Sequence, residues 1–403
     1  MKRKILFLFQ NYFWIVCFSQ IVCIFTDRMW IFTALMPIIL FYLALKAPCR
    51  LKKNNILDLL MICIFISIVI SWIINDFPYK GILVFRFIIT QGAFMTAYYI
   101  GKNLLVEESY RVFYNALLPS FVCAILGLIL YVYQPGWYMA QVKNPLSLEA
   151  LRLRSIFPSP YTCTYLSFFL ISYLLAGNFK LIPNLRIDLS NKIIVVLYFI
   201  FIVLLLFGMM RAPIVGVLIS VGLAVFHSLL INHQVKPLLT AIIFSFLFCA
   251  VGWLILDKCM DVESRDFLIK KFVVATDKDS DFLESRAQLF VAEETLFGDG
   301  AGRHAIYSDD YQEFVIADTC YQRLKQEVGA VGLIFHLLLF LFVIFKCVLN
   351  YRYLTFELSI MLFLMLSMIG ADPLGTPDKH SFFYWLIIGR VSSFRGLKLS
   401  SKR

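Results

Sequence analysis

Residues 193–231 read IIVVLYFIFIVLLLFGMM, then Arg211, then APIVGVLISVGLAVFHSLLI. The run before Arg211 has 18 residues and the run after it has 20, and neither contains Lys, Arg, Asp or Glu. A helix needs about 20 apolar residues to cross a bilayer. The stretch therefore predicts two membrane-spanning helices with a single arginine between them.

The whole chain has the composition of a membrane protein. Of its 403 residues 61% are hydrophobic and 40 are Phe, which excludes an ordinary soluble protein. The first hydrophobic segment, roughly Ile5 to Phe25, lacks a small-x-small cleavage site after it, so we expect an uncleaved helix. The sequence predicts an all-α polytopic membrane protein with about twelve transmembrane helices. The hydrophobic segments are centred near residues 15, 38, 65, 91, 123, 168, 202, 221, 247, 339, 363 and 386.

The loops between these segments alternate in positive charge. One set is rich in Lys and Arg, whereas the short loops of the other set carry single cations such as Arg28, Lys80 and Lys379. Cytoplasmic loops carry the excess of Lys and Arg, so both termini are predicted to be cytoplasmic. The net charge of +11 is then mostly a topology signal, and it requires no nucleic-acid partner. The rich set includes Lys2, Arg3, Lys4, Lys46, Arg50, Lys52, Lys53, Lys102, Arg111, Lys180, Arg186, Lys192, Lys236, Lys346, Arg352 and Arg395.

Two longer polar segments fall on the opposite, outer side, at residues 135–160 and 257–328. The second holds 9 Lys and Arg against 16 Asp and Glu, a net charge of −7. The predicted organisation is therefore residues 1–256 with nine transmembrane helices, a large helical extracytoplasmic loop at 257–328, and residues 329–403 with three more helices and a cytoplasmic tail.

The large loop contains the most informative polar residues. Asp281 and Glu284 have the spacing of a capping box that opens a helix, and residues 298–302, Gly-Asp-Gly-Ala-Gly, end it in a tight turn. Arg286 on that helix is either solvated at the membrane surface or directed inward. Asp318 is either the N-cap of the next helix or a base that orients an acceptor hydroxyl.

Further arginines lie at or inside predicted spans, and each has a structural explanation as a snorkelling, interfacial or ion-paired side chain. Arg152 and Arg154 stand just before a span, Arg211 separates two spans, and Arg86 lies in the middle of one. Under the predicted topology, the outer face holds Arg152, Arg154, Arg211, Arg286 and Asp318. A cationic cluster beside one carboxylate suits transfer of a sugar from a diphosphate, because Arg neutralises the charge that grows on the leaving group.

The sequence predicts no metal site and no cofactor. It contains no Cys or His spacing typical of metal ligands, and it has only five His. Cys259 and Cys320 fall in the long polar segment, where they either form a disulfide or remain free thiols.

Four short stretches, in this order, resemble the bacterial O-antigen polymerase and O-antigen ligase superfamily. They are the arginine-containing approach ending Phe157-Pro158-Ser159-Pro160, the span end Met210-Arg211-Ala212, Ser285-Arg286 with the glycine turn after it, and Asp318-Thr319 before Glu327-Val-Gly-Ala-Val-Gly332. The resemblance implies a GT-C-like fold and a metal-independent glycosyltransferase on the outer face of the bacterial cytoplasmic (inner) membrane.

The resemblance also implies the substrates and the roles of residues. Donor and acceptor would be undecaprenyl-diphosphate-linked saccharides, with membrane lipid and a chain-length regulator as further partners. By motif match, Arg211 and Arg286 would bind the diphosphate and Asp318 would complete the catalytic set. The remaining substrate-binding candidates are Arg152, Arg154, Arg86 and Thr319.

Three functions remain open, and the sequence favours the polymerase over the ligase and the transporter. Ligases of the superfamily carry a His pair or His-Asn where this chain has Asp318-Thr319, which favours a polymerase of O-antigen or capsular repeat units over transfer to lipid A core. A different class is a lipid-linked saccharide flippase or other transporter, which would spread charges along several spans. This sequence concentrates polarity in one outer segment, and Arg86 is the clearest charge inside a span, so an enzyme is favoured.

Overall fold

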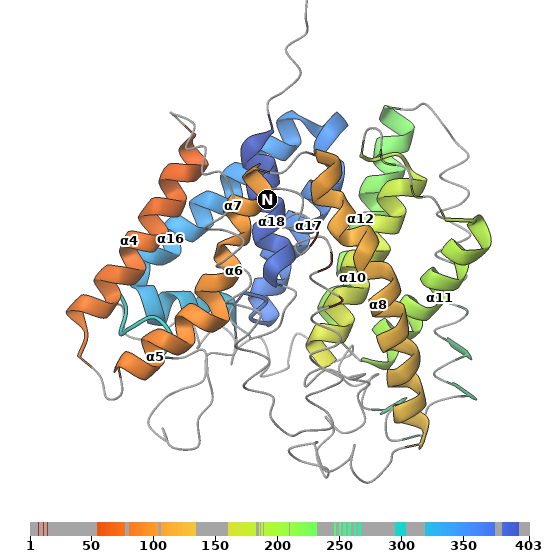
Figure 1. Cartoon of the computed structure of the whole chain (residues 1–403), viewed down its shortest axis with the longest axis horizontal. Helices are drawn as coiled ribbons and strands as arrows, with labels where there is room; N and C mark the ends of the chain where they lie inside the picture. The colour runs from red at the N-terminus through yellow and green to blue at the C-terminus, as the bar shows by residue number, and fades with distance from the viewer. Residues whose placement is uncertain are drawn as a thin grey trace, which may run out of the picture. The chain divides into compact units, whose positions relative to one another are not determined.

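The structure is a computed structural model that describes residues 55–76, 80–103, 106–133, 160–182, 189–208, 210–231, 295–303, 319–374 and 381–394, a few residues within 183–188, and single residues elsewhere. Every regular element in this part of the chain is a helix, which confirms the all-α prediction (Figure 1). The elements are α4 (Ile56–Ile74), α5 (Lys80–Phe87), η1 (Ile88–Gly92), α6 (Ala93–Met95), α7 (Ala97–Asn103), α8 (Val106–Tyr133), α10 (Pro160–Asn178), α11 (Asn191–Phe207), α12 (Arg211–Leu230), α16 (Cys320–Leu349), α17 (Tyr351–Gly370) and α18 (Ser381–Ser393).

These helices coincide with nine of the twelve predicted hydrophobic segments. The segments near residues 15, 38 and 247 lie largely outside the described residues, so the number of spans stays a prediction. Within the described ranges, five helices are long and apolar enough to cross a membrane. They are Ile56–Ile74, Ser109–Tyr133, Arg211–Leu230, Cys320–Leu349 and Tyr351–Gly370. A membrane-embedded protein is thus supported, whereas the GT-C-like arrangement stays an implication of the resemblance.

The chain divides into two compact units. Unit 1 contains Met1–Gln10, Thr33–Arg111 and Glu293–Arg403, and unit 2 contains Asn11–Phe32 and Val112–Ala292. These units follow packing, since unit 1 combines early helices with the last three. The predicted division at residues 256 and 328 follows loops along the sequence and stays a prediction.

In unit 1, α4 packs along α16, and α7 packs along α18 (Figure 1). The buried face of α4 carries Leu57, Leu60, Met61, Ile64 and Ile68 at helical spacing. Its opposite face is equally apolar but exposed, as expected where lipid is the solvent. The hydrophobic effect does not bring helices together in lipid, so close packing must do so.

Glycines allow that close packing between α7 and α18. A side chain at Gly101 would overlap the carbonyl of Leu386, and one at Gly389 would overlap the carbonyl of Tyr98. The two backbones therefore approach each other at reciprocal small residues, as is common between membrane helices.

In unit 2, α10 packs against both α11 and α12. Phe113 of α8 stacks on Tyr173, with ring centroids 5.7 Å apart, and the Ser172 and Ser220 hydroxyls share a hydrogen bond of 2.9 Å. A Cβ at Gly208 would overlap Thr164 Cγ2, so the turn between α11 and α12 lies against the start of α10.

The described turn at residues 295–303 confirms the tight glycine turn predicted from the sequence. Gly298, Gly300 and Gly302 all have positive φ. The helix expected before it lies outside the described residues. After the turn, Cys320–Val328 forms the first part of α16, which agrees with the helix that we expected directly after Asp318.

Helix α16 is interrupted at Gly329, which has φ 70° and ψ −173°. Only glycine adopts this backbone conformation readily. A Cβ at Gly329 would also overlap the main chain of Gly298 and Leu296. The break and the glycine turn are thus in direct contact, although they are well separated in the sequence.

We expect Gly329→Ala to lower the free energy of unfolding by more than about 2 kcal/mol, because it adds backbone strain to a steric overlap. Gly370→Ala is the matched control, since a Cβ there would meet no atom within 4 Å. The melting temperature of each purified variant in detergent, compared with that of the wild type, measures the loss of stability. An equal change in the two variants would contradict the proposed contact.

Candidate functional site

Arg323, in the first part of α16, is the centre of a buried polar cluster in unit 1. Its Nε donates to Asp372 Oδ2 at 2.6 Å, and its Nη1 donates to Gln91 Oε1 at 2.7 Å and to Glu327 Oε2 at 2.9 Å. The Arg323 side chain is 2% exposed. We call Arg323, Asp372, Glu327 and Gln91 the Arg323 centre.

The four residues of the Arg323 centre come from three separate parts of the chain. Arg323 and Glu327 are one turn apart on α16, and Asp372 follows the end of α17. Gln91 lies on η1, a π-helical segment, and such segments occur often at functional sites. A buried charge is stable only when it is paired, so this cation ties α16 to its neighbours.

A small cavity of about 20 Å³ adjoins the Arg323 centre. Gln91, Arg323, Glu327 and His336 contribute its polar lining, and Phe87 and Trp385 contribute apolar walls. Gln91 Nε2 is buried and has no hydrogen-bond partner. The cavity has room for about one water molecule, which the amide of Gln91 could bind.

Thr319 occupies the N-cap of α16. Its side chain accepts a hydrogen bond from Gln322 N at 3.2 Å, and Thr319 is 1% exposed. The N-cap alternative that we raised for Asp318 is therefore wrong by one residue. Asp318 itself lies outside the described residues, so its predicted catalytic role stays a prediction, as does the substrate-binding role of Thr319.

The first turn of α16 is held tightly at this point. Cys320 N donates to Ala371 O at 3.0 Å, and Tyr321 Oη donates to Met365 O at 3.1 Å. Cys320 is a free, buried thiol with Sγ 3.9 Å from Arg323 Nη2, so it does not form the disulfide with Cys259 that we considered. The N-terminal end of α16 is thus bonded to the C-terminal part of α17 and the residue that follows it.

Arg211 is the first residue of α12 in unit 2. Its N-cap, Met210, provides no side-chain hydrogen bond to the helix. A cation at the positive end of the helix dipole makes this end attractive to anions. The contact of Gly208 with Thr164 puts Arg211 at the end of unit 2 where α10 begins. In the sequence, α10 begins shortly after Arg152 and Arg154.

The other predicted site residues are not placed by the structure. Arg86 belongs to α5, but its side chain is outside the described part, and Arg286, Arg152 and Arg154 lie outside the described residues. Among the residues that are described, no group of three or more His, Cys, Asp or Glu is arranged to hold a metal ion.

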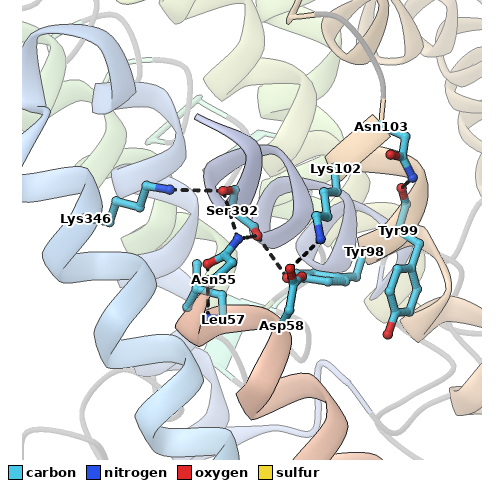
Figure 2. Close-up of polar contacts among 9 residues, drawn as sticks. All are labelled: Asn55, Leu57, Asp58, Tyr98, Tyr99, Lys102, Asn103, Lys346 and Ser392. Carbon is cyan, nitrogen blue, oxygen red and sulfur yellow. Dashed lines mark hydrogen bonds and ion pairs between the residues drawn. The ribbon is translucent and has the colours of Figure 1, made fainter. Parts of the chain in front are cut away.

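A second polar cluster lies at the N-terminal end of α4, which is opposite to the end that carries Ser71 (Figure 2). Asp58 forms an ion pair with Lys102 and accepts a hydrogen bond from Tyr98 Oη at 2.5 Å. Ser392 accepts from Asn55 Nδ2 and, through its carbonyl, from Lys346 Nζ at 3.1 Å. We call these six residues the Asp58 network. Along α4, Asp58 is about 20 Å from Ser71, which reaches the Glu327 carbonyl.

The Asp58 network changes how two sequence signals are interpreted. Lys102 and Lys346 were counted as cytoplasmic loop charges, but Lys102 is only 8% exposed and Lys346 is partly buried. Two further ionisable side chains are buried, since Glu357 is fully buried, accepts a hydrogen bond from Tyr110, and interacts electrostatically with the buried Arg390. Charges inside helices are therefore more numerous than the sequence suggested.

Sequence reasoning missed Arg323, Asp372 and Gln91. The spacing of Arg323 and Glu327, four residues apart, was a usable signal, because such pairs face each other on a helix. Both residues fall in the polar helix that we expected between Asp318 and the span beginning near Gly329, but we did not use their spacing. Asp372 and Gln91 carried no signal, because only the packing of three segments brings them to Arg323.

Arg323→Met should lower the free energy of unfolding by about 3–5 kcal/mol, since it leaves Glu327 and Asp372 buried without their cation. Arg352→Met is the control, because Arg352 is exposed. Thermal unfolding in detergent compares the two. A loss at Arg323 no larger than that at Arg352 would contradict a structural role for this centre.

No protein-family model matches this sequence, and no curated protein sequence matches it.

Proposed function

We propose that this chain is a metal-independent glycosyltransferase that polymerises undecaprenyl-diphosphate-linked oligosaccharide repeat units into O-antigen or capsular polysaccharide. The reaction would take place on the outer face of the bacterial cytoplasmic (inner) membrane. No cofactor is required by the proposed chemistry.

One observation carries the proposal. Two of the stretches behind the family resemblance are bonded to each other in unit 1, because Gly300 N of the glycine turn donates to Glu327 O at 3.3 Å. Neighbouring residues add to this contact, since Asp299 N donates to Gln326 O at 2.8 Å and Val331 N donates to Leu296 O at 3.2 Å. The Arg323 centre fixes the helix that starts directly after Asp318. Catalytic groups require such a rigid support, because a misplacement of about 1 Å can cost two orders of magnitude in rate.

The proposed reaction is a displacement at the anomeric carbon of the donor sugar. A hydroxyl of the acceptor saccharide forms the new C–O bond, and the bond from the anomeric carbon to the diphosphate oxygen breaks. Asp318 takes the proton of the attacking hydroxyl. Undecaprenyl diphosphate leaves with the bonding electrons, and its growing negative charge is neutralised by Arg211 and Arg286.

The remaining candidates would bind substrate. Arg152 and Arg154 would contact the diphosphate or acidic sugars, and Arg86 and Thr319 would contact the saccharides. Arg323 is excluded from direct diphosphate binding in this proposal, because its Nε and Nη1 hydrogen bonds are already made to Asp372, Gln91 and Glu327. Its role would be to position the start of α16.

A transporter of lipid-linked saccharides is the second candidate. It is favoured by the buried charges of unit 1, especially Glu357 with Arg390 and Asp58 with Lys102, since ionisable groups inside a membrane domain often belong to substrate or proton pathways. A flippase would move lipid-linked single units across the membrane, whereas the polymerase acts on units that are already outside. The product seen in cells therefore separates the two.

We expect Asp318→Asn to lower the rate of polymerisation by about 10²–10⁴-fold, because the amide cannot accept the proton. The cell would then carry single repeat units on the lipid A core and no long chains, as seen in a gel of the surface polysaccharide at matched protein levels. Asp266→Asn is the control, since it makes the same change at an exposed position in the same polar segment.

The other outcomes for Asp318→Asn have different meanings. Normal long chains would remove Asp318 from the catalytic set. Loss of even the single capped unit, with accumulation of lipid-linked saccharide outside the cell membrane, would point to the ligase. Accumulation of lipid-linked units on the cytoplasmic face would point to the transporter.

Arg211→Lys should also abolish long chains, because lysine keeps the charge but lacks the planar guanidinium that binds a diphosphate through two parallel hydrogen bonds. Arg265→Lys serves as the control at a partly exposed arginine. If Arg211→Lys gives wild-type ladders at equal protein level, bidentate binding by Arg211 is ruled out.

A further inference from the structure

An apolar groove in unit 2 lies between α8 and α11 and has a volume of about 560 Å³. Its walls include Trp14, Leu118, Phe121, Val196 and Leu197. Lys192 is the charged residue among the described residues that line it. The groove is therefore apolar along most of its length and cationic at one point.

The position of Lys192 gives the groove a definite polar end. Lys192 is an exposed residue in the first turn of α11, where Ser190 caps the helix by accepting from Ile193 N. The helix N-terminus adds its own partial positive charge. The apolar lining residues of α11, such as Val196 and Leu197, lie one turn further along. A ligand that fits both features is an amphiphile with an anionic head and a hydrocarbon tail.

The surroundings indicate that the amphiphile comes from the bilayer. Exposed apolar side chains flank the groove on both helices, among them Val122 on α8 and Val195 and Phe199 on α11. The segment that leads into α11 contains Lys180, Arg186 and Lys192 against the single carboxylate of Asp188. Basic segments next to membrane helices attract anionic lipid headgroups, and this loop belongs to the predicted cytoplasmic set.

We propose that this groove binds one anionic phospholipid, with its phosphate at Lys192 and the N-terminus of α11 and one acyl chain along the α8–α11 wall. The acyl chain gains little by leaving the bilayer, so the headgroup provides the selectivity. One lysine near an anionic lipid gives a preference of about five-fold over a zwitterionic lipid. This site is independent of the proposed catalytic residues and stands whether or not the chain is a polymerase.

Native mass spectrometry of the full-length chain in neutral detergent tests the proposal. Phosphatidylglycerol and phosphatidylcholine with identical acyl chains are titrated in separate samples, and the fraction of protein with one bound lipid is measured. We expect about five-fold tighter binding of phosphatidylglycerol to the wild type. Inorganic phosphate in excess should not displace it, because a free anion lacks the acyl chain.

Two pairs of variants locate the site. Lys192→Gln should remove the preference for phosphatidylglycerol, whereas Lys180→Gln should keep it, because Lys180 is exposed and does not line the groove. Val196→Phe should weaken binding of both lipids by filling the groove. Val195→Phe should not, since Val195 is 65% exposed and is not among the residues that line the groove.

Three results would overturn the proposal. They are equal binding of the two phospholipids by the wild type, equal effects of the two lysine variants, and displacement of phosphatidylglycerol by a lower concentration of undecaprenyl phosphate. The last would assign the groove to a polyprenyl lipid instead. Lys192→Gln changes an exposed side chain, so the test does not depend on the stability of the groove-filling variant.

Discussion

The break of α16 at Gly329 is the constraint on which the rest of unit 1 depends. It leaves main-chain groups of α16 without their helical partners, and buried groups of this kind need other hydrogen-bond partners. The glycine turn supplies those partners on both sides of the break, through Thr295 and Leu296 carbonyls and through the N–H groups of Asp299 and Gly300. Positive φ at Gly298 and Gly329 allows the two segments to come that close.

Helix α4 also forms hydrogen bonds with the break of α16 and with the glycine turn. Ser71 donates to the Glu327 carbonyl at 2.5 Å, Trp72 donates to the Ala301 carbonyl at 2.8 Å, and Asn75 donates to the Gly298 carbonyl at 2.7 Å. The Asp58 network then joins the other end of α4 to α7, α16 and α18. Polar clusters at both ends of an apolar helix fix its register, which apolar packing in lipid specifies weakly.

The same arrangement bears on the proposed chemistry. A polymerase must hold an acceptor hydroxyl in line with a scissile bond while the product chain grows, so the base must be carried by an element that does not move. The start of α16 meets that requirement, because its cap, its first backbone amide and Arg323 are all bonded to neighbours. In this proposal the other buried ionisable residues of unit 1, such as Asp58 with Lys102 and Glu357 with Arg390, stabilise the fold. They would line a substrate or proton pathway only if the protein were a transporter.

The sequence alone determined the membrane class, the helical nature of the elements and the approximate position of nine of the helical segments. An apolar run of about 20 residues in lipid forms a helix, because only a helix satisfies its backbone hydrogen bonds within the run. It also predicted the glycine turn, since Gly-Asp-Gly-Ala-Gly can hardly continue a helix. It did not reveal that Thr319 rather than Asp318 is the N-cap of α16. Only the tertiary structure showed that Arg323 contacts Asp372 and Gln91. A buried cation needs partners, and these two come from segments that are far from Arg323 in the sequence. For the same reason the sequence counted Lys102 as a loop charge, whereas in the folded chain Asp58 of α4 lies beside Lys102 of α7 and the two form a buried ion pair.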